Sequence, residues 1–188
     1  MNHLIVYAHP NKESFNHVIL KTAVEGLQKK GHEVEVRDLY VMKFQPTLSR
    51  SEMIGGIGED VVAEQEYLKW ADVITFIYPI WWTGLPAIMK GYIDRVFSYG
   101  FAYKYINGVQ MGLMQGKKVV IINTQGKSHA EYAATGMDKA LRLTSDKGIF
   151  EYCGFDVMYH LFFESVPNPD EAIRQAWLDQ IADMASKA

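Results

Sequence analysis

Along the chain, segments with the hydrophobic pattern of β-strands alternate with segments that have the α-helical period of about 3.6 residues. Continuous apolar runs at 3–8, 72–79 and 117–124 are typical of strands buried on both faces of a sheet. In HEVEVRDL, 32–39, valines alternate with charged residues, which indicates an edge or half-exposed strand. A further run, FDVMYHLFF, lies at 155–163. The pattern therefore predicts five strands.

Helical periodicity occupies the intervals between these strands. Apolar residues from Phe15 to Leu27 follow the i, i+3, i+4 series, and Ser14 precedes them as an N-cap. Leu85 and Pro86 open another helix, because proline is tolerated in the first turn. A further helix is expected at 59–71, and a mixture of loop and helix is expected within 130–152. The last helix should follow the start signal Asn168-Pro169-Asp170-Glu171.

Two intervals follow neither period. The stretch 40–58 contains Pro46 and three glycines, which argue against regular structure. In 98–116, aromatic residues alternate and are followed by Asn107-Gly108, a dipeptide favoured in type I′ hairpin turns. We expect an inserted hairpin in this second interval.

Strands that alternate with helices imply right-handed crossovers, a parallel sheet and helices on both of its faces. The 188 residues, of which 48% are hydrophobic, are enough to bury one substantial core. We therefore expect one doubly wound α/β domain over residues 1–188.

Composition narrows the classes of function. A net charge of -3 without a basic block disfavours nucleic-acid binding, which needs a field that neutralises phosphates. The single Cys153 excludes an intramolecular disulfide and a cysteine-rich metal site, and it favours a reducing compartment. The first residues do not resemble a leader, and no later stretch approaches membrane-spanning length. We expect a cytoplasmic protein without metal ligands or membrane insertion.

Open parallel sheets bind ligands at the carboxyl ends of their strands, where the strand order reverses. The loop after strand 3–8 lacks the glycine patterns of dinucleotide and P-loop sites. It instead carries His9, Ser14 and Asn16 before a helix N-terminus, where free N–H groups can hold a phosphate. Ser14 and Asn16 are also ordinary capping residues, so helix capping is the alternative explanation.

The loops after strands 72–79 and 117–124 end at the same edge of the expected sheet. The first, YPIWWTG at 78–84, has two adjacent indoles that could exclude water beside a planar ring. Core packing would also account for tryptophan here. The second loop offers Thr124, Gln125 and Gly126, then Tyr132, although Gly126 also suits a plain turn.

Together these loops resemble the NAD(P)H:quinone oxidoreductases of the flavodoxin-like fold. That family includes small bacterial NAD(P)H dehydrogenases and ancillary subunits of potassium-efflux systems. The likeness rests on AHP with SFN at 14–16, on YPIWWTGLPAIMKGYIDRVFSYGFAY at 78–103, and on YCGF at 152–155. It covers nearly the whole chain and implies a five-stranded sheet of order 2-1-3-4-5.

The resemblance also implies a flavin site. His9, Ser14, Phe15 and Asn16 would hold the phosphate and ribityl region, Pro79, Ile80, Trp81 and Trp82 would cradle the ring, and Thr124, Gln125, Gly126 and Tyr132 would lie near its pyrimidine edge. Adjacent side chains of an extended loop point opposite ways, so one indole would face the ring while the other shapes the substrate pocket or the core. Tyr132 would donate a hydrogen bond to the charge that develops there. FMN is expected before FAD, because the C-terminal extension of the mammalian members has no counterpart in this sequence.

The activity implied is two-electron, ping-pong transfer of a hydride from NAD(P)H to the flavin and then to a quinone or similar flat acceptor. The alternatives are a flavodoxin-type electron carrier, which would be more acidic, and a regulatory subunit of a potassium-efflux transporter. The apolar character of the insertion predicts a C₂ homodimer, and the resemblance implies the same assembly because members of that family are commonly homodimers. The apolar side chains of the insertion are Phe101, Tyr103, Tyr105, Met111 and Met114. The stretch 40–58 would either close over the substrate or pack on the partner.

Overall fold

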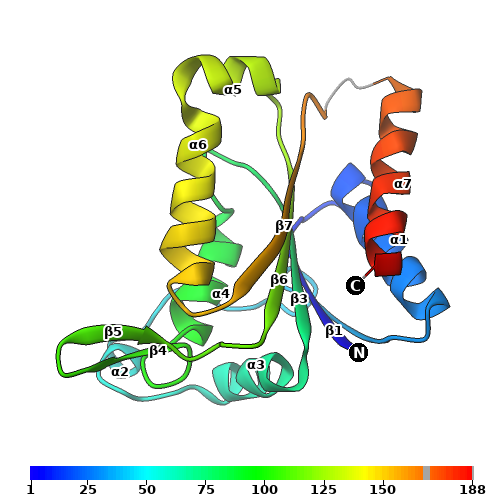
Figure 1. Ribbon diagram of the computed structural model, residues 1–188. Helices are drawn as coiled ribbons and strands as arrows, with labels where there is room; N and C mark the ends of the chain where they lie inside the picture. Colours follow the sequence, from blue (N-terminus) through cyan, green and yellow to red (C-terminus); the bar gives the residue numbers. More distant parts are fainter. Residues whose placement is uncertain (167–169, 188) are drawn as a thin grey trace.

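The computed structural model describes residues 1–166 and 170–187 (Figure 1). Its five-stranded sheet is parallel throughout and has the order β2-β1-β3-β6-β7, which confirms the predicted topology. The expected strands agree with the observed ones to within one residue at each end. Their bounds are β1 Asn2–Tyr7, β2 Glu33–Asp38, β3 Val73–Pro79, β6 Lys118–Thr124 and β7 Asp156–Phe163.

The burial of each strand follows its hydrophobic pattern. Every residue of β3 is buried at the centre of the sheet, whereas β2, with its alternating charges, is an edge strand and has no buried residue. On one face, Leu4, Phe76 and Ile121 pack against helices that follow β2, β3 and β6. On the other face, Ile5 and Ile77 pack beneath α1 and α7. The sheet thus has a core on each face. Figure 1 shows the sheet from its edge, with helices on both sides.

The helices begin and end near the predicted positions. Ser14 caps α1 by accepting a hydrogen bond from the His17 N–H group, as its position in the sequence predicts. The principal helices are α1 Phe15–Lys29, α3 Glu59–Trp70, α4 Ala87–Val96 and α7 Glu171–Lys187. Of the expected start of α7, Asn168 and Pro169 lie outside the described residues.

The interval 130–152 is more helical than the sequence indicates. Helix α5, His129–Thr135, ends at Gly136, whose φ of 74° is left-handed. Helix α6, Met137–Arg142, then runs directly into a π-helical segment, η1 Leu143–Glu151. Segments of π-helix are uncommon and often occur at functional positions.

The interval 98–116 contains the antiparallel hairpin of β4, Tyr103–Ile106, and β5, Val109–Gly112. Asn107 and Gly108 have φ values of 51° and 78°, as a two-residue type I′ turn requires. Met114, named above among the apolar side chains of the insertion that would form an interface, is only 5% exposed and belongs to the core, so that prediction was wrong for this residue.

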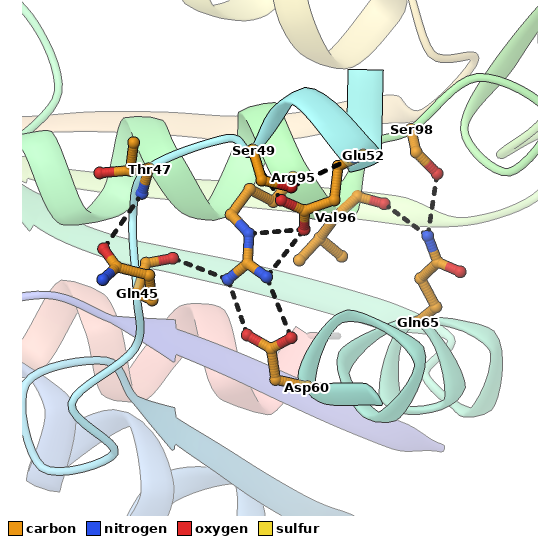
Figure 2. A network of polar contacts seen from close by, with 9 residues as sticks. All are labelled: Gln45, Thr47, Ser49, Glu52, Asp60, Gln65, Arg95, Val96 and Ser98. Carbon is orange, nitrogen blue, oxygen red and sulfur yellow. Dashed lines mark hydrogen bonds and ion pairs between the residues drawn. The ribbon is translucent and has the colours of Figure 1, made fainter. Parts of the chain in front are cut away.

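The stretch 40–58 contains a short helix, α2 Arg50–Met53. This helix was not predicted, because the proline and glycines of the stretch argue against regular structure. The guanidinium group of Arg95 on α4 holds α2 in place (Figure 2). This group donates to Glu52 at 2.8 Å, to the Gln45 carbonyl at 2.7 Å and twice to Asp60 at the start of α3. Arg95 is the largest cause that lowers the pKa of Glu52 to about 2. The stretch therefore packs against its own chain.

Among the helices of the described residues, none combines the length and the apolar character needed to cross a membrane.

Candidate active site

A cavity of about 380 Å³ opens at the carboxyl edge of the sheet. It lies where β1 and β3 meet and the chain reverses its direction of travel across the sheet, the position at which such folds bind ligands. The three predicted loops all contribute to it. Ten of the predicted cofactor residues line it: His9, Ser14, Phe15, Asn16, Pro79, Ile80, Trp81, Thr124, Gln125 and Gly126. We call this cavity the ring pocket.

Asn16 connects the first and third of these loops. It is 3% exposed, and its amide nitrogen donates to the Thr124 hydroxyl at 2.7 Å. Its Oδ1 is buried and has no hydrogen-bond partner within the described protein. Buried polar atoms are normally paired, so an unpaired oxygen beside a cavity marks a place for a ligand donor. In the first turn of α1, the N–H groups of Phe15 and Asn16 also lie here without intrahelical partners, whereas that of His17 is bonded to Ser14.

His9 and Trp81 contribute neighbouring aromatic rings to the lining of the ring pocket. Their ring centroids are 6.0 Å apart, at an interplanar angle of 58°. Nδ1 of His9 lies 3.1 Å from both the N and the O atom of Asn11, which anchors the ring and leaves Nε2 for a ligand. Burial lowers the pKa of His9 and therefore favours a neutral imidazole.

The two tryptophans occupy a tight turn, not the extended loop that was expected. The N–H group of Trp81 donates to the Gly84 carbonyl at 3.1 Å, and the reverse bond has the same length. Between them, Trp82 and Thr83 have φ values of 51° and 55°. Trp81 is 41% exposed and lines the ring pocket, whereas Trp82 is 100% exposed and does not. Left-handed angles at two such residues store strain, which is commonest at functional sites.

The end of β6 forms the floor of the ring pocket. The N–H group of Ile80 donates to the Thr124 carbonyl at 2.8 Å, and that of Gln125 donates to Phe163 at 2.8 Å. A Cβ atom on Gly126 would meet no described protein atom within 4 Å. Any need for glycine there would therefore come from a ligand and not from the packing of the chain.

Tyr132 lies in a neighbouring cavity of about 240 Å³, between α5, α6 and the end of β7. The two cavities share Gln125, whose side-chain oxygen is buried and unpartnered within the described protein. The structure thus places Tyr132 beside the ring pocket but not in its lining. His129, to which no role is assigned, also lines this second cavity.

Val166 lines the ring pocket but was missed by the sequence analysis. Its N–H group donates to the Gln125 carbonyl at 3.1 Å, which joins the segment after β7 to the loop after β6. The available signal was the position of β7, because its carboxyl end must reach the same edge as the other parallel strands.

The residues present suit a flat, partly apolar ligand that carries an anion. The indole of Trp81, together with Ile80 and Pro79, offers apolar surface, while Asn16 and Gln125 present unpaired acceptors to ring N–H groups or hydroxyls. The N-terminus of α1 supplies donors for an anionic group. A flavin mononucleotide has all of these features, so the lining fits that cofactor.

Comparison with known proteins gives a consistent result. A family model described as the flavodoxin-like fold matches residues 1–184. An uncharacterized NAD(P)H oxidoreductase from Haemophilus influenzae is 41% identical over 97% of this chain and 93% of its own length. NAD(P)H dehydrogenase (quinone) 1 from Cavia porcellus is 37% identical over 82% of this chain, a match that spans 65% of that relative.

Among solved structures, the NAD(P)H:quinone oxidoreductase from Methanothermobacter marburgensis is similar over 98% of this chain and 97% of its own. It has a TM-score of 0.88 and 30% sequence identity. The similarity therefore extends over all five strands and the loops that line the ring pocket.

Proposed function

Because the chain belongs to the flavodoxin-like family, and its relatives are named NAD(P)H oxidoreductases and NAD(P)H dehydrogenases (quinone), we propose that it is an NAD(P)H-dependent quinone oxidoreductase that uses a flavin. The observation that carries this proposal is the ring pocket, which brings ten separately predicted residues from three loops into one cavity. A flavin, when bound, supplies two-electron chemistry by accepting a hydride and passing the electrons to a second substrate.

The proposed form of the cofactor is FMN. Its terminal phosphate would take hydrogen bonds from the first turn of α1 and from Ser14, where the helix dipole also favours negative charge. Asn16 would meet the ribityl chain through its unpaired Oδ1. His9, neutral because it is partly buried, would donate from Nε2 on the same side.

The remaining residues would position the ring and act on the charge that develops there. Trp81 would exclude water from one side of the ring, and Gln125 would accept from its polar edge. Tyr132, from the adjoining cavity, would donate its hydroxyl hydrogen to that edge. NAD(P)H and a quinone would use the open mouth of the ring pocket in turn, which is a ping-pong sequence.

A homodimer is the proposed assembly. Several large apolar side chains are exposed on α2, on the residues that follow α2, on the segment before the hairpin and on the hairpin itself. They are Met53 at 73%, Ile54 at 81%, Ile57 at 49%, Tyr99 at 62% and Val109 at 68% exposed. Three of them, Met53, Ile57 and Tyr99, line one surface cavity with Tyr103. A patch of this kind commonly marks an interface between subunits.

The proposal is tested with purified protein. Chromatography of the acid-released chromophore should identify FMN, and the reconstituted protein should oxidise NAD(P)H when a benzoquinone is supplied. A protein that binds neither FMN nor FAD, and that remains inactive after incubation with both, would contradict it.

A further inference from the structure

A chain of polar side chains runs across the sheet directly below the ring pocket. Asp146 Oδ1 on η1 lies 2.6 Å from His160 Nδ1 on β7, and His160 Nε2 lies 2.8 Å from Asn123 Oδ1 on β6. Asn123 Nδ2 then donates to the Tyr78 carbonyl on β3 at 3.1 Å. The His160 side chain is 1% exposed and that of Asp146 is 14% exposed.

The chain ends at the residues that begin the ring pocket. Tyr78 directly precedes Pro79, and Asn123 directly precedes Thr124. Pro79 and Thr124 both line the ring pocket. Tyr78 and Asn123 are also direct partners in the β3·β6 register. A shift of the Asn123 amide would therefore move the ends of both strands that support a bound ring.

The directions of both hydrogen bonds made by Asn123 can be derived. A carbonyl only accepts, so Nδ2 of Asn123 must face Tyr78 and Oδ1 must face His160. Nε2 of His160 must then carry a hydrogen. Because a bond of 2.6 Å to Asp146 also needs a hydrogen, the pair must hold one proton more than a neutral imidazole beside an ionised carboxylate.

Other groups near the pair tie it to its surroundings. Arg142 donates to the His160 carbonyl at 3.2 Å, and its Nη1 lies 3.8 Å from Asp146 Oδ2. Burial raises the pKa of Tyr78 to about 12, so this phenol stays neutral. Phe162 stacks on the His160 ring with centroids 4.0 Å apart. The π-helical backbone of η1 carries Asp146 into this contact.

We propose that His160, held by Asp146, is a positioning residue for the ring pocket, and that the proton shared by the pair keeps Asn123 and Tyr78 aligned. The inference rests on the proposed flavin site. Loss of the proton would set the lone pair of Nδ1 against the carboxylate of Asp146, and the His160 ring would turn away from Asn123. Burial lowers the pKa of His160 below its ordinary value of 6.5, although the hydrogen bond to Asp146 opposes that shift, so loss of the proton is centred below pH 6.5.

Asp146→Asn separates a positioning role from general support of the core. An amide can donate to Nδ1 of a neutral His160, so Nε2 keeps its hydrogen and its bond to Asn123 without an extra proton. The alignment should then no longer depend on pH. His160→Gln, by contrast, should break the chain at every pH. His3→Gln is the matched control, because His3 is also a buried histidine of this sheet, on β1, and lines a different cavity.

The experiment titrates FMN into the cofactor-free chains by flavin fluorescence, between about pH 5 and pH 8. For wild type and for the His3→Gln control we expect the affinity to fall about fivefold or more as pH rises, for Asp146→Asn a pH profile set by the ionisation of FMN alone, and for His160→Gln about tenfold weaker binding throughout. Nitrogen-15 NMR of histidine in the cofactor-free wild type should show hydrogens on both nitrogens of His160 at the low end of this range.

Two results would overturn the inference while the proposed function stands. One is tight FMN binding by wild type with the same pH profile as Asp146→Asn. The other is a His160 ring that lacks a hydrogen on Nε2. If His160→Gln fails to fold, the comparison of wild type with Asp146→Asn still decides the question. Absence of FMN binding by every chain, wild type included, would contradict both the inference and the proposed cofactor.

Discussion

The side-chain amide of Asn16, in the first turn of α1, donates a 2.7 Å hydrogen bond to the hydroxyl of Thr124, at the last position of β6. The two residues are 108 positions apart and both are buried. This bond fixes the loop proposed to bind phosphate against the strand end proposed to lie under the ring. It also leaves Oδ1 of Asn16 as an unpaired acceptor at the ring pocket.

Thr124→Val should therefore weaken FMN binding, because it removes the acceptor for Asn16 and leaves a buried donor unpaired. We expect about a tenfold increase in Kd, and a free energy of unfolding lower by about 1–2 kcal/mol. Fluorescence titration and urea unfolding measure the two effects. Thr22→Val on α1 is the control, since the Thr22 hydroxyl only bonds the Val18 carbonyl of its own helix. Unchanged FMN affinity in Thr124→Val would exclude this role.

The tryptophan turn allows a comparison of adjacent residues. Trp81→Ala should raise the Kd for FMN more than tenfold by removing about 1.5 kcal/mol or more of apolar contact with the ring. Trp82→Ala should change that Kd by less than about twofold, because Trp82 is fully exposed and lies outside the ring pocket. Equal losses in the two variants would show that Trp82 also contacts the cofactor.

The same turn should be easy to stabilise. Trp82→Asn with Thr83→Gly gives the sequence that a type I′ turn prefers, in place of two residues held at φ values above 50°. We expect the free energy of unfolding to rise by about 1 kcal/mol. If Trp82 serves the substrate, quinone reduction should fall while stability increases. A lower melting temperature would show that the turn is not strained.

Arg95 should be critical to stability. Arg95→Met leaves Glu52, Asp60 and the Gln45 carbonyl without their donor, so we expect a loss of about 3 kcal/mol or more in urea unfolding. Lys90→Met on the same helix is the control, because its ion pair with Asp94 is exposed and worth only about 0.5 kcal/mol. Similar losses in the two variants would contradict the network drawn in Figure 2.

The network also sets a dependence on pH. Arg95 holds the folded pKa of Glu52 at about 2, below the ordinary value of 4.5. Its contribution is therefore complete above about pH 4.5 and is lost as the pH falls toward 2. In Arg95→Met this loss should largely disappear, which unfolding curves recorded across that range would reveal.

His3 acts in a higher window of pH. It is 1% exposed, its Nε2 has no partner within the described protein, and burial lowers its pKa from 6.5 to about 4. The unfolded chain therefore binds the proton more tightly, so stability should fall by at most about 3 kcal/mol as the pH drops from 6.5 to 4. His3→Leu should remove most of that slope. An unchanged slope would assign the loss to other groups.

The sequence was most informative where local pattern and tertiary burial agree. The apolar runs that became β1, β3 and β6 lie at the centre of the sheet, so hydrophobicity alone located them. The lining of the ring pocket was predictable because parallel strands bring their following loops to one edge. The hairpin was predictable because Asn107-Gly108 suits one turn type.

Features that depend on distant partners could not be predicted in this way. Helix α2 exists because Ser49 and Glu52 form a capping box and Arg95, far along the chain, holds Glu52. The tight turn that exposes Trp82 needs the bonds between Trp81 and Gly84, which no propensity of these residues favours. The chain through His160 depends on side chains from η1, β7 and β6 and on a backbone carbonyl of β3, which are far apart in the sequence. No role was predicted for any of these residues.

The proposed hydride transfer through a bound flavin can be observed by anaerobic rapid mixing of the FMN-loaded protein with one equivalent of NAD(P)H, followed by a benzoquinone in a second mix. We expect the visible absorbance of the bound flavin to be lost in the first mix without quinone, and to return in the second after the oxidised nicotinamide has been removed. Flavin absorbance that NAD(P)H leaves unchanged, or that the quinone fails to restore, would contradict the proposed transfer.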